Sequence, residues 1–239
     1  MIFSGAAPLG PDLSRECVER IGCGIRQGYG MTETSPVTHS SPSDPARMKM
    51  GSVGTAAPNT DCKLVDPATG DELGPNQEGE VCVRGPQIMR GYLNNPEATA
   101  RTIDSDNWLH TGDIGYADED GHFFIVDRVK ELIKYKGFQV APAELEAILL
   151  THPAVADAAV IPCHDDEAGE VPKAFVVAKQ ETSPEAIMDF VAERVAPHKK
   201  IRELEFIEQI PKSLSGKILR RVLIEKERAK GPHRMGANT

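Results

Sequence analysis

The stretch HFFIVDRVKELIKYKGFQVAPAELEAILL, residues 122–150, decides how the chain is divided. Its apolar, β-prone run at residues 123–126 stops at a charged step, residues 127–130. Farther along, Pro142 stands where a helix would begin. Apolar residues then follow at the three-and-four spacing of one buried helical face: Leu145, Ile148 and Leu149. The stretch therefore predicts a joint between two folded bodies.

Basic side chains crowd this joint. Lys130, Lys134 and Lys136 lie close in sequence to Arg128 and to Gly137, where the backbone can approach a ligand closely. Several cations and donors beside a glycine suit an anionic nucleotide or a thiol cofactor. The alternative is a charged hairpin edge with a solvated face, which is the usual outcome for a run of surface charge.

Four segments carry a resemblance to a known family. In chain order they are QGYGMTE at residues 27–33, WLHTGD at residues 108–113, VDR followed by IKYKGFQVAPAELE between residues 126 and 146, and PKSLSGK at residues 211–217. With these segments the chain resembles the adenylate-forming (AMP-binding) enzymes, the group of 4-coumarate:CoA ligase, fatty acyl-CoA synthetases and firefly luciferase. The resemblance covers nearly all of the chain, and four matches in one order make it specific.

The resemblance implies a mixed fold, α/β and α+β. Residues 1–127 would be the C-terminal remnant of the large AMP-binding domain. Within it, residues 1–50 would form an α/β part and residues 51–127 a small β-barrel-like subdomain, which the short alternating runs there also favour. Residues 128–130 would be a hinge, and residues 131–239 a compact α+β C-terminal lid domain.

The composition is that of a soluble globular protein. Hydrophobic residues make up 40% of the 239 residues and charged residues 26%, and no apolar run approaches the roughly 20 residues that a membrane span needs. A net charge of −9 argues against a nucleic-acid binder, because polyanion binding depends on an excess of basic surface. These features predict a cytoplasmic protein without stable membrane insertion.

The cysteines predict neither a disulfide framework nor a zinc site. They are odd in number, widely spaced and without a CxxC pair: Cys17, Cys23, Cys62, Cys82 and Cys163. We expect reduced, mostly packed thiols.

The N-terminal segment predicts a strand at residues 1–4 and a helix at residues 11–21, with Leu13, Cys17, Val18 and Ile21 on one face. The first residues therefore already belong to an α/β layer. In the family, an earlier Ser/Thr/Gly-rich loop with a lysine holds the ATP phosphates, and this sequence contains no such loop. We therefore expect the back part of an adenylating enzyme, inactive or severely impaired in adenylation by itself. The open, apolar sheet edge predicts an N-terminal partner fragment or self-association.

The next chemical cluster lies around Tyr29. Glycines on both sides let the backbone come close to a flat ring, and an aromatic face suits stacking on adenine. Thr32 offers a hydroxyl to a phosphate oxygen, and Glu33 is a hard oxygen ligand for Mg²⁺. The resemblance implies the same roles, with Tyr29 beside adenine, Thr32 at the α-phosphate and Glu33 at the metal. It also implies cofactor contacts from nearby residues: Gly5, Ala6, Ala7, Gln27, Gly28 and Gly30. By itself, a tyrosine between two glycines is also typical of a plain turn.

Pro36 and Val37 follow this cluster, and in the family this stretch lines the acyl pocket. Two apolar residues there imply that the small substrate is an aromatic or aliphatic carboxylic acid.

Asp113 follows a glycine, where a carboxylate can accept hydrogen bonds from both ribose hydroxyls. The resemblance implies that Arg128 reaches the same ribose. The alternative for Asp113 is a cap at the start of a strand, because aspartate is common in turns.

The C-terminal part predicts three strands and a helix, at residues 154–161, 174–179, 203–207 and 183–195. A loop then presents Lys217. It differs from a Walker loop, because Pro211 stands where the pattern requires glycine and Ile218 where it requires Ser or Thr. The resemblance implies that Lys217 reaches the substrate carboxylate and the α-phosphate together. A last helix is predicted at residues 218–230.

The resemblance implies the two half-reactions of an acid–thiol ligase. A carboxylic acid and MgATP give acyl-AMP and pyrophosphate, and the thiol of coenzyme A then displaces AMP. Rotation about the hinge, which includes Lys130, would bring Lys217 to the nucleotide in the first step. In the second step it would bring a different edge to the thiol channel: Lys134, Lys136, Gly137 and Gln139. Lys217 and Lys134 are the catalytic candidates.

Two other functions stay open. A non-catalytic module could use the ribose and CoA contacts for binding alone. Luciferase-like oxidation of an acyl-adenylate is the third option, and Pro36 and Val37 argue against it because the luciferase sequence differs there.

Overall fold

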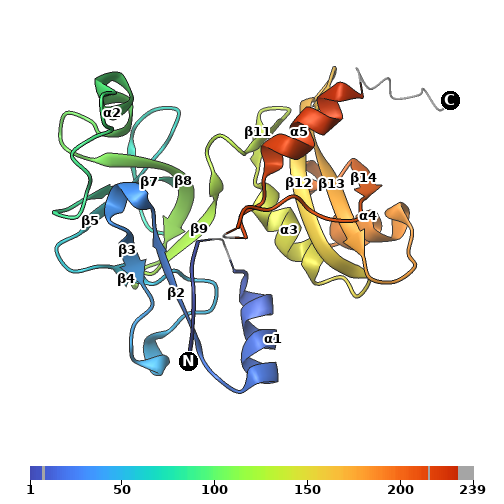
Figure 1. The fold of residues 1–239 in the computed structure, drawn as a ribbon, viewed down its shortest axis with the longest axis horizontal. Coiled ribbons are helices and arrows are strands. Elements are labelled where there is room, and N and C mark those ends of the chain that lie inside the picture. The colour runs from blue at the N-terminus through green and yellow to red at the C-terminus, as the bar shows by residue number, and fades with distance from the viewer. Residues whose placement is uncertain (7–8, 215, 231–239) are drawn as a thin grey trace. The chain divides into compact units, whose positions relative to one another are not determined.

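Short apolar runs separated by turns form three sheets in the computed structural model, which describes residues 1–6, 9–214 and 216–230. The chain divides into two units, Met1–Lys130 and Glu131–Thr239 (Figure 1). The first unit holds two of the sheets, and the second unit holds the third. The mixed fold class predicted from the sequence is confirmed. The predicted hinge residues close the first unit, and their hinge role remains a prediction.

The first sheet has the order β1-β2-β3-β4 and begins with a parallel pair. Its strands are β1 (Ile2–Ser4), β2 (Ile25–Gly30), β3 (Val37–Ser40) and β4 (Thr55–Ala56). Helix α1 (Pro11–Ile21) makes the crossover from β1 to β2. It starts at a proline, and it ends at Gly22, whose φ of 70° places it in the left-handed region that stops a helix. Two single-turn helices lie within this part, η1 (Thr32–Thr34) and η2 (Pro45–Arg47).

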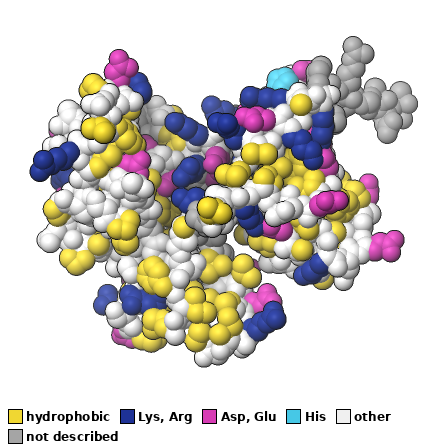
Figure 2. All heavy atoms as spheres, viewed as in Figure 1, with side chains coloured by type: hydrophobic (Ala, Val, Ile, Leu, Met, Phe, Trp, Pro, Cys, Tyr) yellow, Lys and Arg dark blue, Asp and Glu magenta, His cyan; other side chains and the backbone are white. Residues whose placement is uncertain are grey.

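The apolar face predicted for α1 is largely exposed. Leu13 is 45% exposed and Ile21 57%, and Phe3 on the neighbouring strand β1 is 59% exposed. Figure 2 shows hydrophobic side chains gathered at the end of the first unit that carries α1. An apolar patch of this kind is typical of a contact surface.

The second sheet has the order β6-β5-β7-β8-β9. Its strands are β5 (Asp61–Val65), β6 (Glu72–Leu73), β7 (Gly79–Arg84), β8 (Leu109–Ala117) and β9 (Phe123–Arg128). Because β6 and β9 are its edges, the subdomain predicted as barrel-like is an open sheet. Helix α2 (Pro96–Thr102) precedes β8, and the Asn95 side chain caps it by accepting the N–H of Ala98.

The short runs at residues 114–117 and 122–126 flank residues 118–121 and predict a hairpin. The structure has this hairpin between β8 and β9. The Asp118 carboxylate accepts the N–H groups of Asp120 and His122, which closes the turn. At the start of β9, Phe123 exchanges backbone hydrogen bonds with Val53 and Gly54 and so ties this sheet to the first one.

The third sheet has the path β11-β10-β13-β12, with β14 paired to β13. Its strands are β10 (Ile133–Tyr135), β11 (Phe138–Val140), β12 (Val155–Asp165), β13 (Gly169–Ala178) and β14 (Glu203–Phe206). Helices α3 (Pro142–Leu150), α4 (Pro184–Ala192) and α5 (Arg220–Ala229) pack on it, and η3 (Pro197–Lys199) precedes β14. Strands β12 and β13 extend beyond the predicted ranges, and α4 ends three residues earlier than predicted.

Alternation along β12 builds a core on each face of this sheet. Ala158 and Val160 belong to the cluster that contains Leu145 of α3, while Ala159 belongs to the cluster that contains Leu223 of α5. Both faces are therefore covered, which explains the continuous apolar run of β12.

Helix α5 buries less of its predicted apolar face than the spacing suggests. Leu223 is buried, but Leu219 and Val222 are exposed. Charged contacts attach the helix instead. At its start, Arg220 pairs with Glu131 and, at 2.6 Å, with Glu146.

Near the end of α5, a buried lysine joins three elements. Lys173 on β13 is 4% exposed, and its Nζ lies 2.7 Å from a Glu227 carboxylate oxygen on α5. On β14, Glu203 and Glu205 lie 3.2 and 3.6 Å from the same ammonium. Burial alone would lower the pKa of Lys173, but the hydrogen bonds that its ammonium donates to Glu227 and Glu203 outweigh burial and raise that pKa.

No helix in the described part of the chain is both long enough and apolar enough to cross a membrane.

Candidate functional site

The centre of the candidate site is the carboxylate of Asp113. Strand β8 places Asp113 directly opposite Arg128 on β9, and the Arg128 Nε lies 3.4 Å from Asp113 Oδ1. The Tyr29 hydroxyl, from β2, donates to Asp113 Oδ2 at 2.6 Å. Asp113 is 7% exposed, whereas Arg128 is exposed. The structure thus brings together three residues that the sequence predicted for the nucleotide site.

Asp113 lies inside β8 and not at its start, so the strand-cap alternative is wrong. Its backbone is fixed from two sides. The N–H of Asp113 donates to Thr111 Oγ1 at 3.1 Å, and this hydroxyl donates to the Val81 carbonyl at 2.7 Å. The preceding N–H, that of Gly112, donates to Glu80 Oε1 at 2.9 Å. Gly112 has a φ of 72°, which favours glycine.

Tyr29 uses its hydroxyl to orient this carboxylate. Burial, and then the neighbouring Asp113 charge, raise the pKa of Tyr29, so the hydroxyl keeps its proton and remains a donor. The Tyr29 ring lies 5.8 Å from the His39 ring and packs on the core around Val53. Contact of Tyr29 with adenine remains a prediction.

The glycines beside Tyr29 make room for the protein itself. A Cβ on Gly30 would lie 1.7 Å from the Pro36 carbonyl oxygen, and one on Gly28 would lie 2.7 Å from the Phe3 ring. The sequence predicts both glycines as openings for a flat ligand ring. The structure corrects this reason, because backbone and side chains of the first unit already occupy both spaces.

We expect Gly30→Ala to destabilise the first unit by about 1–3 kcal/mol, the usual cost of forcing extra volume into a packed site. Gly24→Ala is the matched control, because a Cβ there meets no atom within 4 Å. Urea unfolding followed by the fluorescence of Trp108, the single tryptophan, reports the stability of this unit. Equal stability of the two variants would show that the Pro36 segment moves aside without lowering the free energy of unfolding.

The other residues predicted around the nucleotide lie along β1 and β2. A Cβ on Gly5 would be 3.6 Å from the Gly28 carbonyl, so Gly5 lies beside β2, and Ala6 is exposed with a φ of 72°. Gln27 is buried, and its Nε2 donates to the Leu9 carbonyl at 3.2 Å, so the side-chain amide hydrogen-bonds within the protein. Ala7 lies outside the described residues.

The residues predicted for phosphate and metal lie in η1, next to Tyr29. Thr32 is exposed, and Glu33 is half-buried with Oε1 accepting the Tyr92 hydroxyl at 2.8 Å. A carboxylate held by one hydrogen bond beside an exposed hydroxyl offers the hard oxygen ligands that suit a largely hydrated Mg²⁺. Pro36 and Val37 follow and are exposed.

In the second unit, one hairpin carries most of the remaining predicted residues. Lys134 pairs with Gln139 in the register of β10 and β11, and Lys136 and Gly137 form the turn between them. All four are exposed. The Lys136 Nζ lies 2.6 Å from Glu167, and this hydrogen bond raises the pKa of Lys136. Lys130 is exposed at the end of the first unit.

Lys217 is exposed in a loop closed by its own backbone. The Lys217 N–H donates to Ser213 Oγ at 3.1 Å, and the Ser213 N–H donates to the Lys217 carbonyl at 2.8 Å. A bridge between Lys212 and Ile218 closes the loop below these bonds. The loop therefore presents the Lys217 ammonium to solvent.

Sequence reasoning missed Glu80 and Thr111, which hold the backbone next to Asp113. Glu80 is 32 residues away from Gly112 in the chain, so no local pattern connects them. The only usable signal was that Glu80 alternates with apolar residues in a predicted strand. This alternation predicts which face of the sheet Glu80 lies on, but not which residue it contacts.

Comparisons with known proteins identify the family of the chain. Residues 1–93 match the model of the AMP-binding enzyme family, and residues 144–217 match the model of the AMP-binding enzyme C-terminal domain. The chain is 56% identical to 4-coumarate–CoA ligase 2 of Oryza sativa subsp. japonica over 229 residues, covering 93% of this chain and 40% of the relative. It is 54% identical to 4-coumarate–CoA ligase 1 of Glycine max over 239 residues, covering 97% of this chain and 82% of the relative. The chain thus spans about 40% of the length of several of these relatives.

Solved structures show the same fold. ATP-bound MatB from Rhodopseudomonas palustris matches with a TM-score of 0.88 at 33% identity, covering 94% of this chain and 44% of that one. The anthranilate CoA ligase AuaEII in complex with anthranoyl-AMP matches with a TM-score of 0.85 at 32% identity, covering 94% and 44%. The two family models, the relatives and the shared fold together show that this chain belongs to the AMP-binding enzyme family, with the 4-coumarate–CoA ligases among its relatives.

Proposed function

We propose that this chain is the ribose-binding and lid part of an AMP-forming carboxylic acid:CoA ligase whose acid is aromatic or aliphatic. The observation that carries the proposal is the Asp113 carboxylate, oriented by the Tyr29 hydroxyl at 2.6 Å and facing Arg128 at 3.4 Å. A buried, fixed carboxylate beside an exposed guanidinium is suited to accept the two hydroxyls of a ribose. The relatives named as 4-coumarate–CoA ligases support the acid and thiol substrates.

The other residues take the roles that their positions allow. Exposed Thr32 and half-buried Glu33 lie on one single-turn helix and would hold an α-phosphate oxygen and a hydrated Mg²⁺. The ion would neutralise phosphate charge during acyl transfer to the nucleotide. Lys217 would stabilise the negative charge that develops on the reacting carboxylate and phosphate oxygens.

The second half-reaction would use the hairpin of β10 and β11. Its turn carries Lys136 and the glycine Gly137, and its strands carry Lys134 and Gln139. An exposed glycine turn with flanking cations suits the passage of a phosphorylated thiol cofactor such as coenzyme A. Residues 128–130 would be the hinge that lets one nucleotide site use both lysine-bearing edges.

Calorimetry with AMP tests the ribose assignment directly. We expect this chain to bind AMP more tightly than 2′,3′-dideoxy-AMP. Asp113→Asn should weaken AMP binding about tenfold to a hundredfold, because hydrogen bonds to a charged group contribute about 1.5–3 kcal/mol. Asp61→Asn is the control, since Asp61 is an exposed carboxylate paired with Arg84 at 3.0 Å. Equal binding of the two nucleotides would contradict the assignment.

Product analysis separates the ligase from the alternatives. The chain is incubated with ATP, CoA and a panel of aromatic and aliphatic acids, and acyl-CoA is measured by mass spectrometry. Acyl-CoA formation supports the ligase. AMP or CoA binding without acyl-CoA, unchanged when the remaining length of the rice ligase is added as a separate fragment, supports a binding module. Light emission with luciferin would support the oxidative option.

We also propose that the exposed face of α1 and the edge of β1 contact another polypeptide, either an N-terminal partner fragment or a second copy. The apolar exposure of Leu13, Ile21 and Phe3 supports this. We expect concentration-dependent self-association in sedimentation equilibrium, weakened about tenfold or more by Ile21→Lys, because an apolar side chain in an interface contributes about 1.5–3 kcal/mol. Met50→Lys, at another exposed apolar residue, is the control. A chain that stays monomeric at all concentrations and does not bind an added N-terminal fragment would contradict this contact.

A further inference from the structure

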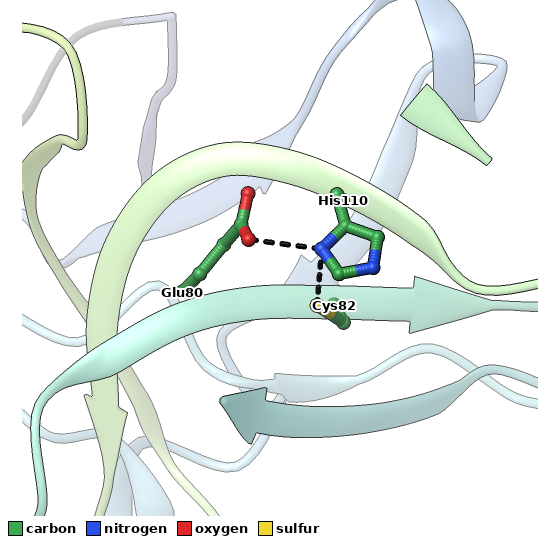
Figure 3. Close-up of side chains that lie close together, drawn as sticks. All are labelled: Glu80, Cys82 and His110. Carbon is green, nitrogen blue, oxygen red and sulfur yellow. Dashed lines mark hydrogen bonds and ion pairs between the residues drawn. The ribbon is translucent and has the colours of Figure 1, made fainter. Parts of the chain in front are cut away.

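Three potential metal ligands meet on one face of the second sheet, at Glu80, Cys82 and His110 (Figure 3). Cys82 on β7 lies directly opposite His110 on β8, and Glu80 is two residues before Cys82. The His110 Nδ1 lies 2.9 Å from Glu80 Oε2 and 3.4 Å from Cys82 Sγ. The three ligand atoms all lie within 4.8 Å of one another.

These atoms are the ligand types that zinc prefers. Carboxylate oxygen, thiolate sulfur and imidazole nitrogen bind Zn²⁺ at about 2.0–2.3 Å, so in a tetrahedral site they lie roughly 3.4–3.6 Å apart. The sulfur-to-nitrogen separation of 3.4 Å already matches this spacing. The oxygen-to-nitrogen separation of 2.9 Å would have to open by only about 0.5 Å.

The second nitrogen of His110 faces a carboxylate, as is usual for a metal-binding histidine. Its Nε2 lies 3.5 Å from Asp104 Oδ2. The other Asp104 oxygen accepts the N–H groups of Asp106 and Trp108, both at 2.9 Å, and these bonds fix the carboxylate.

A metal ion could take the place of the proton in the hydrogen bond between His110 and Glu80. When Nε2 of His110 carries the proton toward Asp104, the lone pair of Nδ1 faces an oxygen of Glu80 across 2.9 Å. Two lone pairs at that distance require a proton or a metal ion between them. The other oxygen of Glu80 accepts the Gly112 N–H, so Glu80 is held in place toward His110.

A second cluster of similar potential ligands already has a cation beside its carboxylates. Cys163, Glu203 and Glu227 also lie within ligand distance of one another, but the ammonium of Lys173 is already between their carboxylates. At the first cluster, Lys63 is opposite Cys82 in the register, and its ammonium lies over the Trp108 ring, 4.6 Å from the ring centroid.

We propose that Glu80, Cys82 and His110 form a site for Zn²⁺, or for a divalent ion of similar ligand preference, with water as the fourth ligand. Binding forms a metal–sulfur bond and releases the thiol proton to solvent. Cys82 is buried, and the partly exposed His110 gives access from solvent. The proposal is independent of the ligase function. It also differs from the sequence-based expectation of no zinc site, because the ligands come from two strands and 28 residues separate the cysteine from the histidine.

The test uses the whole untagged chain, stripped of metal by a chelator and kept reduced. Titration with Co²⁺ is expected to saturate at one ion per chain, with a thiolate-to-cobalt charge-transfer band that added Zn²⁺ removes. Calorimetry then gives the Zn²⁺ affinity. We expect Cys82→Ser to remove the band, and Asp104→Asn to weaken Zn²⁺ binding 10–100-fold, the usual effect of removing the carboxylate behind a ligating histidine.

Cys163→Ser and Cys62→Ser are the matched controls, because each thiol also lies near a potential ligand, Glu203 and His39 respectively. Both controls should keep the band and the affinity. Failure of the wild-type chain to bind at one equivalent would overturn the site and leave a hydrogen-bonded Glu80–His110 pair only. Loss of the charge-transfer band in either control would also overturn the site. This outcome can be observed even if the Cys82→Ser variant does not fold.

Discussion

Replacing Lys173 by methionine is expected to destabilise the second unit by about 3–5 kcal/mol. Methionine keeps the length and apolar character of the side chain but leaves Glu203, Glu205 and Glu227 without their shared ammonium. Breaking a buried charged group by removing one partner costs about this much, because the remaining charges stay desolvated. The expected value is at the lower end, since Lys230 still lies 3.0 Å from Glu227.

The matched control is Lys226→Met on helix α5, the helix that carries Glu227. The Lys226 side chain is 52% exposed and lies 3.5 Å from Glu205, so its loss should change stability by less than about 1 kcal/mol. Hydrogen exchange of the β12 and β13 amides in increasing urea measures the second unit, and Trp108 fluorescence should not change. The double variant Lys173→Met/Glu227→Leu should recover part of the loss. If Lys173→Met were no worse than Lys226→Met, the buried cluster would contribute nothing.

The same cluster predicts the direction of acid sensitivity. Burial would raise the pKa of Glu227, but hydrogen bonds from Lys173 and Lys230 outweigh it and lower that pKa. A carboxylate with a lowered folded-state pKa stabilises the fold above its unfolded pKa, and this contribution is lost as pH falls through the folded value. The second unit of wild type should therefore lose stability on acidification, and Lys173→Met should lose less.

Replacing Lys217 by alanine is expected to lower the adenylation rate by about 10²–10³-fold, or roughly 2.7–4 kcal/mol in the barrier, the usual contribution of one preorganised group that faces developing negative charge. The structure supports this role because hydrogen bonds between Ser213 and Lys217 close the loop and leave the ammonium exposed. Its substitution should not change stability, since Lys217 packs on no core.

Pyrophosphate exchange measures this step. Because the chain spans about 40% of the rice ligase, the assay is run with the chain alone and with the remaining length of that ligase added as a separate fragment. Lys226→Ala is the control, as an exposed lysine outside the loop. Exchange that survives in Lys217→Ala, at a rate within about threefold of wild type, would remove Lys217 from the adenylation step.

Local patterns were enough to predict the parts of the site that depend on one hairpin. The alternating runs around the Asp118 turn predicted β8 and β9, and this pairing places Asp113 opposite Arg128. At Gly137 the sequence offers a hairpin edge as the alternative to a ligand site, and the turn there brings Lys134 next to Gln139. In each case the register follows from residues that are close in sequence.

Partners from distant segments could not be predicted. The hydrogen bond from Tyr29 to Asp113 joins residues 84 positions apart, and only the packing of the first sheet on the second makes it. For the same reason, Gly30 was interpreted as an opening for a ligand when the Pro36 carbonyl fills that space. Helix α1 has the predicted bounds, but periodicity cannot tell whether an apolar face is covered, and Leu13 and Ile21 are exposed.

A crystal structure of this chain with AMP would test the central claim most directly. We predict both ribose hydroxyls within hydrogen-bond distance of the Asp113 carboxylate, with the Tyr29 hydroxyl still bonded to its other face and the Arg128 guanidinium beside the sugar. AMP bound elsewhere, or a ribose whose hydroxyls point away from Asp113, would contradict the assignment of this carboxylate as the ribose site.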